Sequence, residues 1–154
     1  MSNKQPLVAA GLLLGFGFGF GGFFDGIVFH QILQTHNMLS NIFFPNTLRN
    51  VEINMFWDGL FHLFNWLSTL LGTFLLWQGL NNKQMHSGKH FISLLLLGWG
   101  LFNIIEGCLD HFMLKLHHVI QKASPIGQLY SDIGFLASGI ILFFIGSIMV
   151  YRHK

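Results

Sequence analysis

The stretch GLLLGFGFGFGGFFDGIVFH, residues 11–30, decides the fold class of this protein. Residues 11–24 consist only of Gly, Leu and Phe, and Asp25 and His30 follow directly. About 20 mainly apolar residues are needed for a helix to cross a lipid bilayer. The stretch has no small-residue cleavage site of the kind that ends a signal peptide. It therefore predicts a retained membrane-spanning helix whose last turns carry ionisable groups.

The composition of the whole chain agrees with this prediction. Of its 154 residues, 52% are hydrophobic and only 9% are charged, whereas about 25% are charged in a soluble domain. Apolar segments of sufficient length lie at about 7–30, 54–80, 90–114 and 128–151. We predict a single all-α transmembrane domain, residues 1–154, that forms a four-helix bundle. The eight scattered Lys and Arg residues are too few for a nucleic-acid surface.

The cationic residues predict the orientation of this bundle in the membrane. Lys4, Lys83, Lys89, Arg152 and Lys154 fall on the side of the termini, and Arg49, Lys115 and Lys122 fall on the other side. Positive loops remain preferentially in the cytoplasm. Both termini are therefore expected in the cytoplasm, with the protein in the bacterial inner membrane.

The two halves of the chain resemble each other. Gly17, Gly19, Asp25, Gly26, His30, Leu33 and His36 recur 81 positions later as Gly98, Gly100, Glu106, Gly107, His111, Leu114 and His117. Asp58, Phe61 and Gly72 recur 74 positions later as Asp132, Phe135 and Gly146. Two helical hairpins of two spans each have the same orientation in a membrane. The pattern predicts two parallel-oriented hairpin repeats around a pseudo-two-fold axis, with equivalent residues facing a shared centre.

Ionisable residues gather at one end of the predicted bundle. Asp25, Asp58, Glu106, Asp110 and Asp132 all lie inside or at the margin of a span. The first and third spans reach this end in their last turns, and the second and fourth reach it in their first turns. A buried carboxylate is costly unless it is paired, protonated or bound to a metal. The layer therefore predicts a functional site.

We predict that this layer is a metal site near the outer face of the membrane. Imidazole and carboxylate groups together suit Zn, Cu(II) or Fe. The expected nitrogen ligands are His30, His62 and His111, and the expected oxygen ligands or orienting groups are Asp25, Asp58 and Glu106; Asp110, His36 and His117 complete the candidate set. His36 and His117 lie at helix ends or in loops, so a solvated interfacial role is an alternative for both.

Regular helix geometry conflicts with a compact site. Asp58 and His62 are four residues apart and share a helix face. Asp25 and His30 are five residues apart, as are Glu106 and His111, which separates them by about 140° on an α-helix. The site must therefore be wider than one ion or include a distorted turn.

A stripe of small residues on the first span predicts a packing seam. Gly11, Gly15, Gly19, Gly22 and Gly26 follow one another at spacings of four and three. Small residues on one helix face let membrane helices approach closely. We assign these glycines to packing against another helix.

Four segments resemble the motifs of an uncharacterised bacterial membrane family, domain of unknown function 2243. They are FDGIVFHQIL, WDGLFH, LGWGLFNIIEGCLDH and YSDIGFLASG, and the resemblance extends from about residue 10 to residue 146. It implies a compact four-span protein in which Asp25, His30, Asp58, His62, Glu106, Asp110 and His111 occupy the family's polar positions. It also implies an association with copper handling and terminal-oxidase assembly, but no activity.

Several functions remain open at this point. A protein with this metal site could act in metal handling, in respiratory oxidase assembly or as a metalloenzyme. The same polar groups suit proton- or cation-coupled transport, and His30 with His111 suits a bis-histidine b-type haem. A purely structural polar layer is a further alternative. The lipid bilayer is the expected environment, and a second copy of the chain or a respiratory-complex partner is compatible with the sequence.

Overall fold

Four long helical rods make up the computed structural model, which describes residues 6–82 and 87–152. The first rod is continuous through α1 (Pro6–Ala10), η1 (Gly11–Phe18), α2 (Gly19–Phe24) and η2 (Asp25–Ile32); the others are α3 (Leu48–Asn81), α4 (Gly88–Glu106) with η3 (Gly107–Met113), and α5 (Pro125–Arg152). Each is long and apolar enough to cross a membrane. The predicted all-α bundle of four spans is confirmed. Lys4, Lys83 and Lys154, used above for the orientation, lie outside the described residues.

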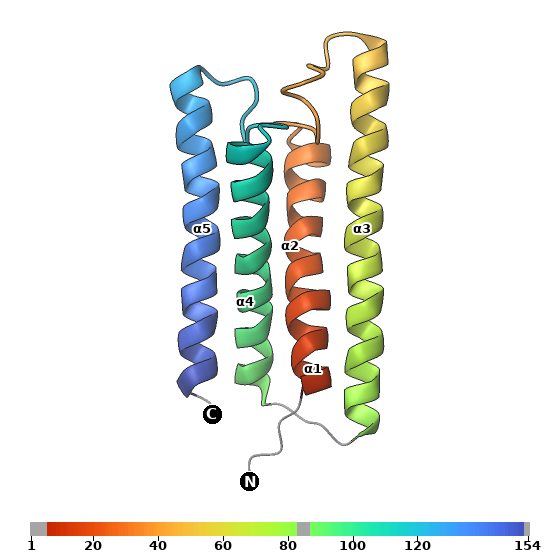
Figure 1. Cartoon of the computed structure of the whole chain (residues 1–154), viewed down its shortest axis with the longest axis vertical. Helices are drawn as coiled ribbons and strands as arrows, with labels where there is room; N and C mark the ends of the chain where they lie inside the picture. Colours follow the sequence, from red (N-terminus) through yellow and green to blue (C-terminus); the bar gives the residue numbers. More distant parts are fainter. Residues whose placement is uncertain (1–5, 83–86, 153–154) are drawn as a thin grey trace.

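The first rod and α4 form the centre of the bundle. α3 packs against the first rod and α5 packs against α4 (Figure 1). Two long connections, residues 33–47 and 114–124, lie together at one end, which we call the loop end (Figure 1). The ends of all four rods that carry the acidic residues meet there.

α3 begins six residues earlier than the apolar pattern predicts. Thr47 caps it, because its side-chain oxygen accepts a hydrogen bond from the backbone N–H of Asn50 at 3.2 Å. The polar residues Arg49 and Glu52 lie in its first turns, which is why hydropathy alone placed them in a loop. At 1.5 Å per residue this 34-residue helix is about 51 Å long, and its first turns stand above the neighbouring rods (Figure 1).

Glycines set the close approach of the rods. A Cβ atom on Gly15 would collide with the Cα atom of Gly72 in α3, and one on Gly17 would lie 2.8 Å from the Cα atom of Gly98 in α4. The other glycines of the predicted stripe, Gly11, Gly19, Gly22 and Gly26, also face α3. The predicted packing seam is confirmed, and α3 is its partner.

Two π-helical segments lie where the sequence required a distortion. η2 begins at Asp25, and η3 begins directly after Glu106. Hydrogen bonds in a π-helix join residues five apart, so residues at this spacing lie almost above one another. Asp25 therefore shares a face with His30, and Glu106 with His111. Beyond these segments the chain turns sharply at Gln34 and Lys115, which both have φ of 50°.

Candidate metal centre

The two long connections fold back over the loop end and bury a histidine each. His36 is 2% exposed and His117 is 0% exposed. The His36 Nδ1 atom lies 2.9 Å from the carbonyl oxygen of Val119, and the His117 Nδ1 atom lies 3.1 Å from that of Met38. A carbonyl oxygen only accepts, so each Nδ1 carries the proton and each Nε2 offers its lone pair to the centre. The interfacial alternative is thereby disfavoured for both.

Burial also sets the protonation of His117. Removal from water lowers its pKa well below the ordinary value of 6.5, and the neighbouring His36 and His111 lower it further. Its imidazole is therefore neutral at pH 7. Metal ions bind imidazole in this form.

Asp58 orients His30 from α3. Its Oδ1 atom lies 3.0 Å from His30 Nδ1 and accepts a hydrogen bond from the backbone N–H of Met38 at 2.8 Å. Its Oδ2 atom accepts from the side-chain amide of Asn37 at 2.8 Å. A carboxylate on the outer nitrogen of a histidine is typical of metal sites, because it fixes the ring and raises its basicity.

Asp132 occupies the corresponding position on α5. Its Oδ1 atom accepts from the backbone N–H of Val119 at 2.9 Å, and its Oδ2 atom lies 2.6 Å from His118 Nδ1. His111 Nδ1 is 3.8 Å away, beyond hydrogen-bond distance. Asp132 and His118 were absent from the predicted ligand set. The 74-residue correspondence between Asp58 and Asp132 was the available signal.

The centre between these groups contains buried polar atoms with no hydrogen-bond partner among the described residues. They include both carboxylate oxygens of Asp25, both of Glu106, and the Nε2 atoms of His30 and His36. His30 Nε2 lies 3.0 Å from Asp25 Oδ2. Two lone pairs at this distance repel each other unless a proton or a cation lies between them. Buried polar atoms without partners are rare and require an explanation.

The inward-facing atoms converge in three overlapping groups. The groups are His30, His36 and His117; Glu106, His111 and His117; and Asp25, His30 and Glu106, with the ligand atoms of each within 4.8 Å of one another. In addition, His111 Nε2 lies 3.1 Å from His117 Nε2. Zn–N bonds of about 2.0–2.1 Å separate two nitrogen ligands of one tetrahedral ion by about 3.3 Å. The spacing therefore suits metal coordination.

Three predicted site residues lie outside these groups. Asp58 acts on His30, as described above. His62 is partly exposed and stacks on Phe23, with ring centroids 6.3 Å apart. Asp110 is partly buried and borders a cavity beside Glu106.

A cavity of about 410 Å³ with a mixed polar and apolar lining lies beside the centre at the loop end. Its walls include His30, His36 and Asp58, together with Gln34 and Lys122 from the two connections. The cavity therefore lies next to the centre, and the His30 and His36 side chains themselves are 0% exposed.

The family model that matches this chain covers residues 10–153 and describes predicted membrane proteins. The chain belongs to the DUF2243 family. The matched part of this DUF2243 protein includes every residue of the buried centre. No curated protein and no solved structure matches the chain.

Proposed function

We propose that this DUF2243 protein binds two transition-metal ions at the loop end of its bundle. One ion takes Asp25, His30 and His36 from the first half, and the other takes Glu106, His111 and His117 from the second half. The observation that carries the proposal is the convergence of buried carboxylate oxygens and imidazole Nε2 atoms of Asp25, Glu106, His30 and His36, for which no fully satisfied hydrogen-bond network exists among the described residues.

Charge supports a cation in this position. Asp25 and Glu106 each have an oxygen within 4.8 Å of the other, and both are less than 5% exposed. Within residues 6–82 and 87–152, the ion pairs of the acids in this layer are all with histidines. Two buried carboxylates without a Lys or Arg partner are strongly destabilising. Divalent ions would supply the missing positive charge.

The donor set supports ions with open coordination positions. Two imidazoles and one carboxylate per ion resemble the arrangement that non-haem iron uses to bind a small molecule, and zinc or manganese also accepts these donors. Three protein ligands leave room for water or substrate. We therefore propose a centre that acts on a molecule rather than a closed structural site.

The proposed orientation places the centre toward the outside of the cell. Lys89 and Arg152 lie at the end opposite the loops, and such residues favour the cytoplasm. Cysteines introduced at Ser87 and Ser124 in a Cys108→Ser background test this orientation. In intact cells, a membrane-impermeant thiol reagent should label the cysteine at 124 and spare the one at 87; the reverse pattern would contradict it.

Elemental analysis of the purified protein tests the metal proposal. Native or reconstituted protein in mild detergent should hold about two metal ions per chain, and Asp25→Asn combined with Glu106→Gln should remove most of this metal. His62→Gln is the matched control, because His62 lies outside the three converging groups, and it should retain the metal. No stoichiometric metal in the unmodified protein would contradict the proposal, and a Soret band would support the haem alternative instead.

A further inference from the structure

Two cavities flank the buried centre in corresponding places. One has a volume of about 350 Å³ and includes Phe18, Phe61 and Glu106, whereas the other has about 390 Å³ and includes Trp99, Phe135 and Asp25. These residues correspond through the 81- and 74-residue offsets. Each cavity therefore ends on one of the two central carboxylates. We call them the Glu106 cavity and the Asp25 cavity.

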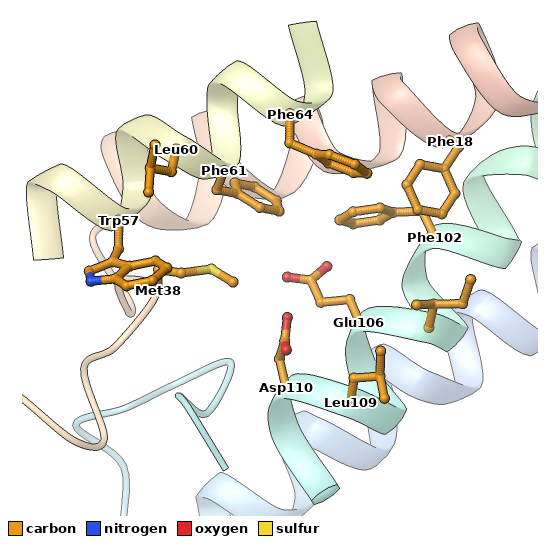
Figure 2. Close-up of a pocket in the computed structure, with 11 residues that line it drawn as sticks. Phe18, Met38, Trp57, Leu60, Phe61, Phe64, Phe102, Glu106, Leu109 and Asp110 are labelled. Carbon is orange, nitrogen blue, oxygen red and sulfur yellow. The ribbon is translucent and has the colours of Figure 1, made fainter. Parts of the chain in front are cut away.

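The Glu106 cavity has large apolar side chains at three positions where the Asp25 cavity has small residues. Trp57, Leu60 and Phe64 of the first correspond to Ser131, Gly134 and Ser138 of the second. Phe18, Phe61 and Phe102 complete the aromatic lining (Figure 2). This enclosure fits a flat apolar molecule.

The Glu106 cavity also has an additional acid. Asp110 lines it together with Glu106, and both carboxylates point into it from the same side (Figure 2). The corresponding residue in the Asp25 cavity is Phe29. Glu106 is 4% exposed and neither of its oxygens has a hydrogen-bond partner among the described residues. The two carboxylates therefore offer hydrogen-bond acceptors at this end of the cavity to a ligand that carries a donor.

The cavity opens toward the side of the bundle that lipid would cover. Leu60, Phe64 and Leu109 line it and are 39%, 54% and 42% exposed. All three are apolar and lie on spans. A ligand would thus enter from the bilayer rather than from water.

We propose that the Glu106 cavity binds a bilayer-dissolved aromatic alcohol of one or two rings. The ring packs among Phe61, Phe64 and Phe102, and the hydroxyl group donates a hydrogen bond to Asp110 or Glu106. A volume of about 350 Å³ lies at the lower end of the range for small-molecule sites, about 300–1,000 Å³. Glu106 belongs both to this cavity and to the proposed metal centre. A role of the ligand as substrate of that centre therefore rests on the proposed function.

Binding of 2-naphthol to the full chain in phosphatidylcholine nanodiscs tests the cavity. We expect saturable binding at one site per chain above the partition into empty nanodiscs. Asp110→Asn keeps the size of the side chain but removes the charged acceptor, and it should weaken binding about tenfold. 2-Methoxynaphthalene has no hydroxyl donor. Its affinity for the unmodified protein should not exceed the affinity of 2-naphthol for the Asp110→Asn variant.

Matched variants separate this site from its counterpart and from general damage. Ser138→Ala in the Asp25 cavity should leave 2-naphthol binding unchanged, whereas Leu60→Trp, which fills the Glu106 cavity, should abolish it. Helical circular dichroism and metal content of Asp110→Asn should equal those of the unmodified protein. Non-saturable binding, equal binding of the two naphthalenes, or no effect of either Asp110→Asn or Leu60→Trp would overturn the proposal.

Chelator-treated protein distinguishes this inference from the metal proposal. Saturable binding of 2-naphthol should persist in the metal-free protein, because the aromatic walls and Asp110 lie outside the metal ligands. Binding in a protein that never takes up metal would support the cavity and refute the metal centre. Loss of saturable binding in folded, metal-free protein would overturn the cavity as an independent site.

Discussion

The two halves of the buried centre each place a carboxylate beside a histidine, but at different distances. In the first half Asp58 lies 3.0 Å from His30 and also binds the connection through Asn37. In the second half Asp132 lies 3.8 Å from His111 and instead makes its shortest contact, 2.6 Å, with His118. Both carboxylates thus anchor a connection, but only Asp58 also lies within hydrogen-bond distance of the inward-facing imidazole. We infer that the two proposed ions have unequal affinities, with the tighter one in the first half.

The close contact between the first rod and α4 carries the largest expected effect. A Cβ atom on Gly98 would collide with the carbonyl oxygen of Leu13 and lie 2.8 Å from Gly17. Gly98→Ala should therefore lower the free energy of unfolding by about 3 kcal/mol or more, as overpacking does when backbone atoms cannot move aside. Gly59→Ala is the control, because nothing lies within 4 Å of its added Cβ. Denaturant titration in detergent measures both, and equal stability of the two variants would refute the close contact between the first rod and α4.

Substitution of the two orienting carboxylates separates the halves next. Asp58→Ala should lower the affinity for the metal ion bound by His30 about 10- to 100-fold, the usual effect of removing a hydrogen-bond partner of a metal ligand. Asp132→Ala should change metal affinity less, since His111 lies beyond hydrogen-bond distance of Asp132, and its main effect should be on stability, since it releases His118 and the backbone of Val119. Competition with a chelator of known affinity measures the first effect, and thermal unfolding measures the second. The opposite ranking of the two variants would show that the distances do not decide the roles.

Acid should weaken the fold through His117. Its pKa is lowered in the folded protein, while an unfolded imidazole titrates near 6.5. The unfolded state therefore binds more protons, so this contribution is present above pH 6.5 and is lost as the pH falls below it. The slope from this single residue is about 1.4 kcal/mol per pH unit. Thermal unfolding of metal-free protein between pH 7.5 and 5 (roughly the range in which His titrates) should show this fall in stability. His117→Gln should reduce the slope of stability against pH by about 1.4 kcal/mol per pH unit.

The sharp turns at Gln34 and Lys115 carry the smallest expected effect. Both residues have φ of 50°, a conformation that costs a residue with a side chain roughly 1–2 kcal/mol and costs glycine little. Gln34→Gly and Lys115→Gly should each raise the unfolding free energy by up to about 1 kcal/mol. Similar gains at both sites would indicate equivalent turns, whereas a loss at either would mean that its side chain stabilises the loop.

Much of this architecture follows from local properties of the sequence. Hydropathy identifies the four spans because each apolar run is long enough to cross a membrane. The spacing of Gly11, Gly15 and Gly19 predicts the seam because close helix packing depends directly on side-chain size. The depth of Asp25 and Glu106 in the membrane follows from their positions in the last turns of the first and third spans.

The details of the centre depend on contacts that no local pattern contains. An α-helical period places His30 and His111 off the faces of their carboxylates, and only the π-helical turns bring them back. His36 and His117 are buried because each connection binds a carbonyl of the other, across about 80 residues. His62 shares a helical face with Asp58, yet its ring stacks on Phe23 of the first rod.

Anomalous diffraction at metal absorption edges from crystals of the reconstituted protein tests the dinuclear centre most directly. The proposal predicts two peaks about 3.5–4 Å apart, one beside Asp25 and His30 and the other beside Glu106 and His111. A His62→Gln crystal should show the same two peaks. The absence of any anomalous peak within coordination distance of Asp25 and Glu106, in protein supplied with iron, zinc, manganese or copper, would contradict it.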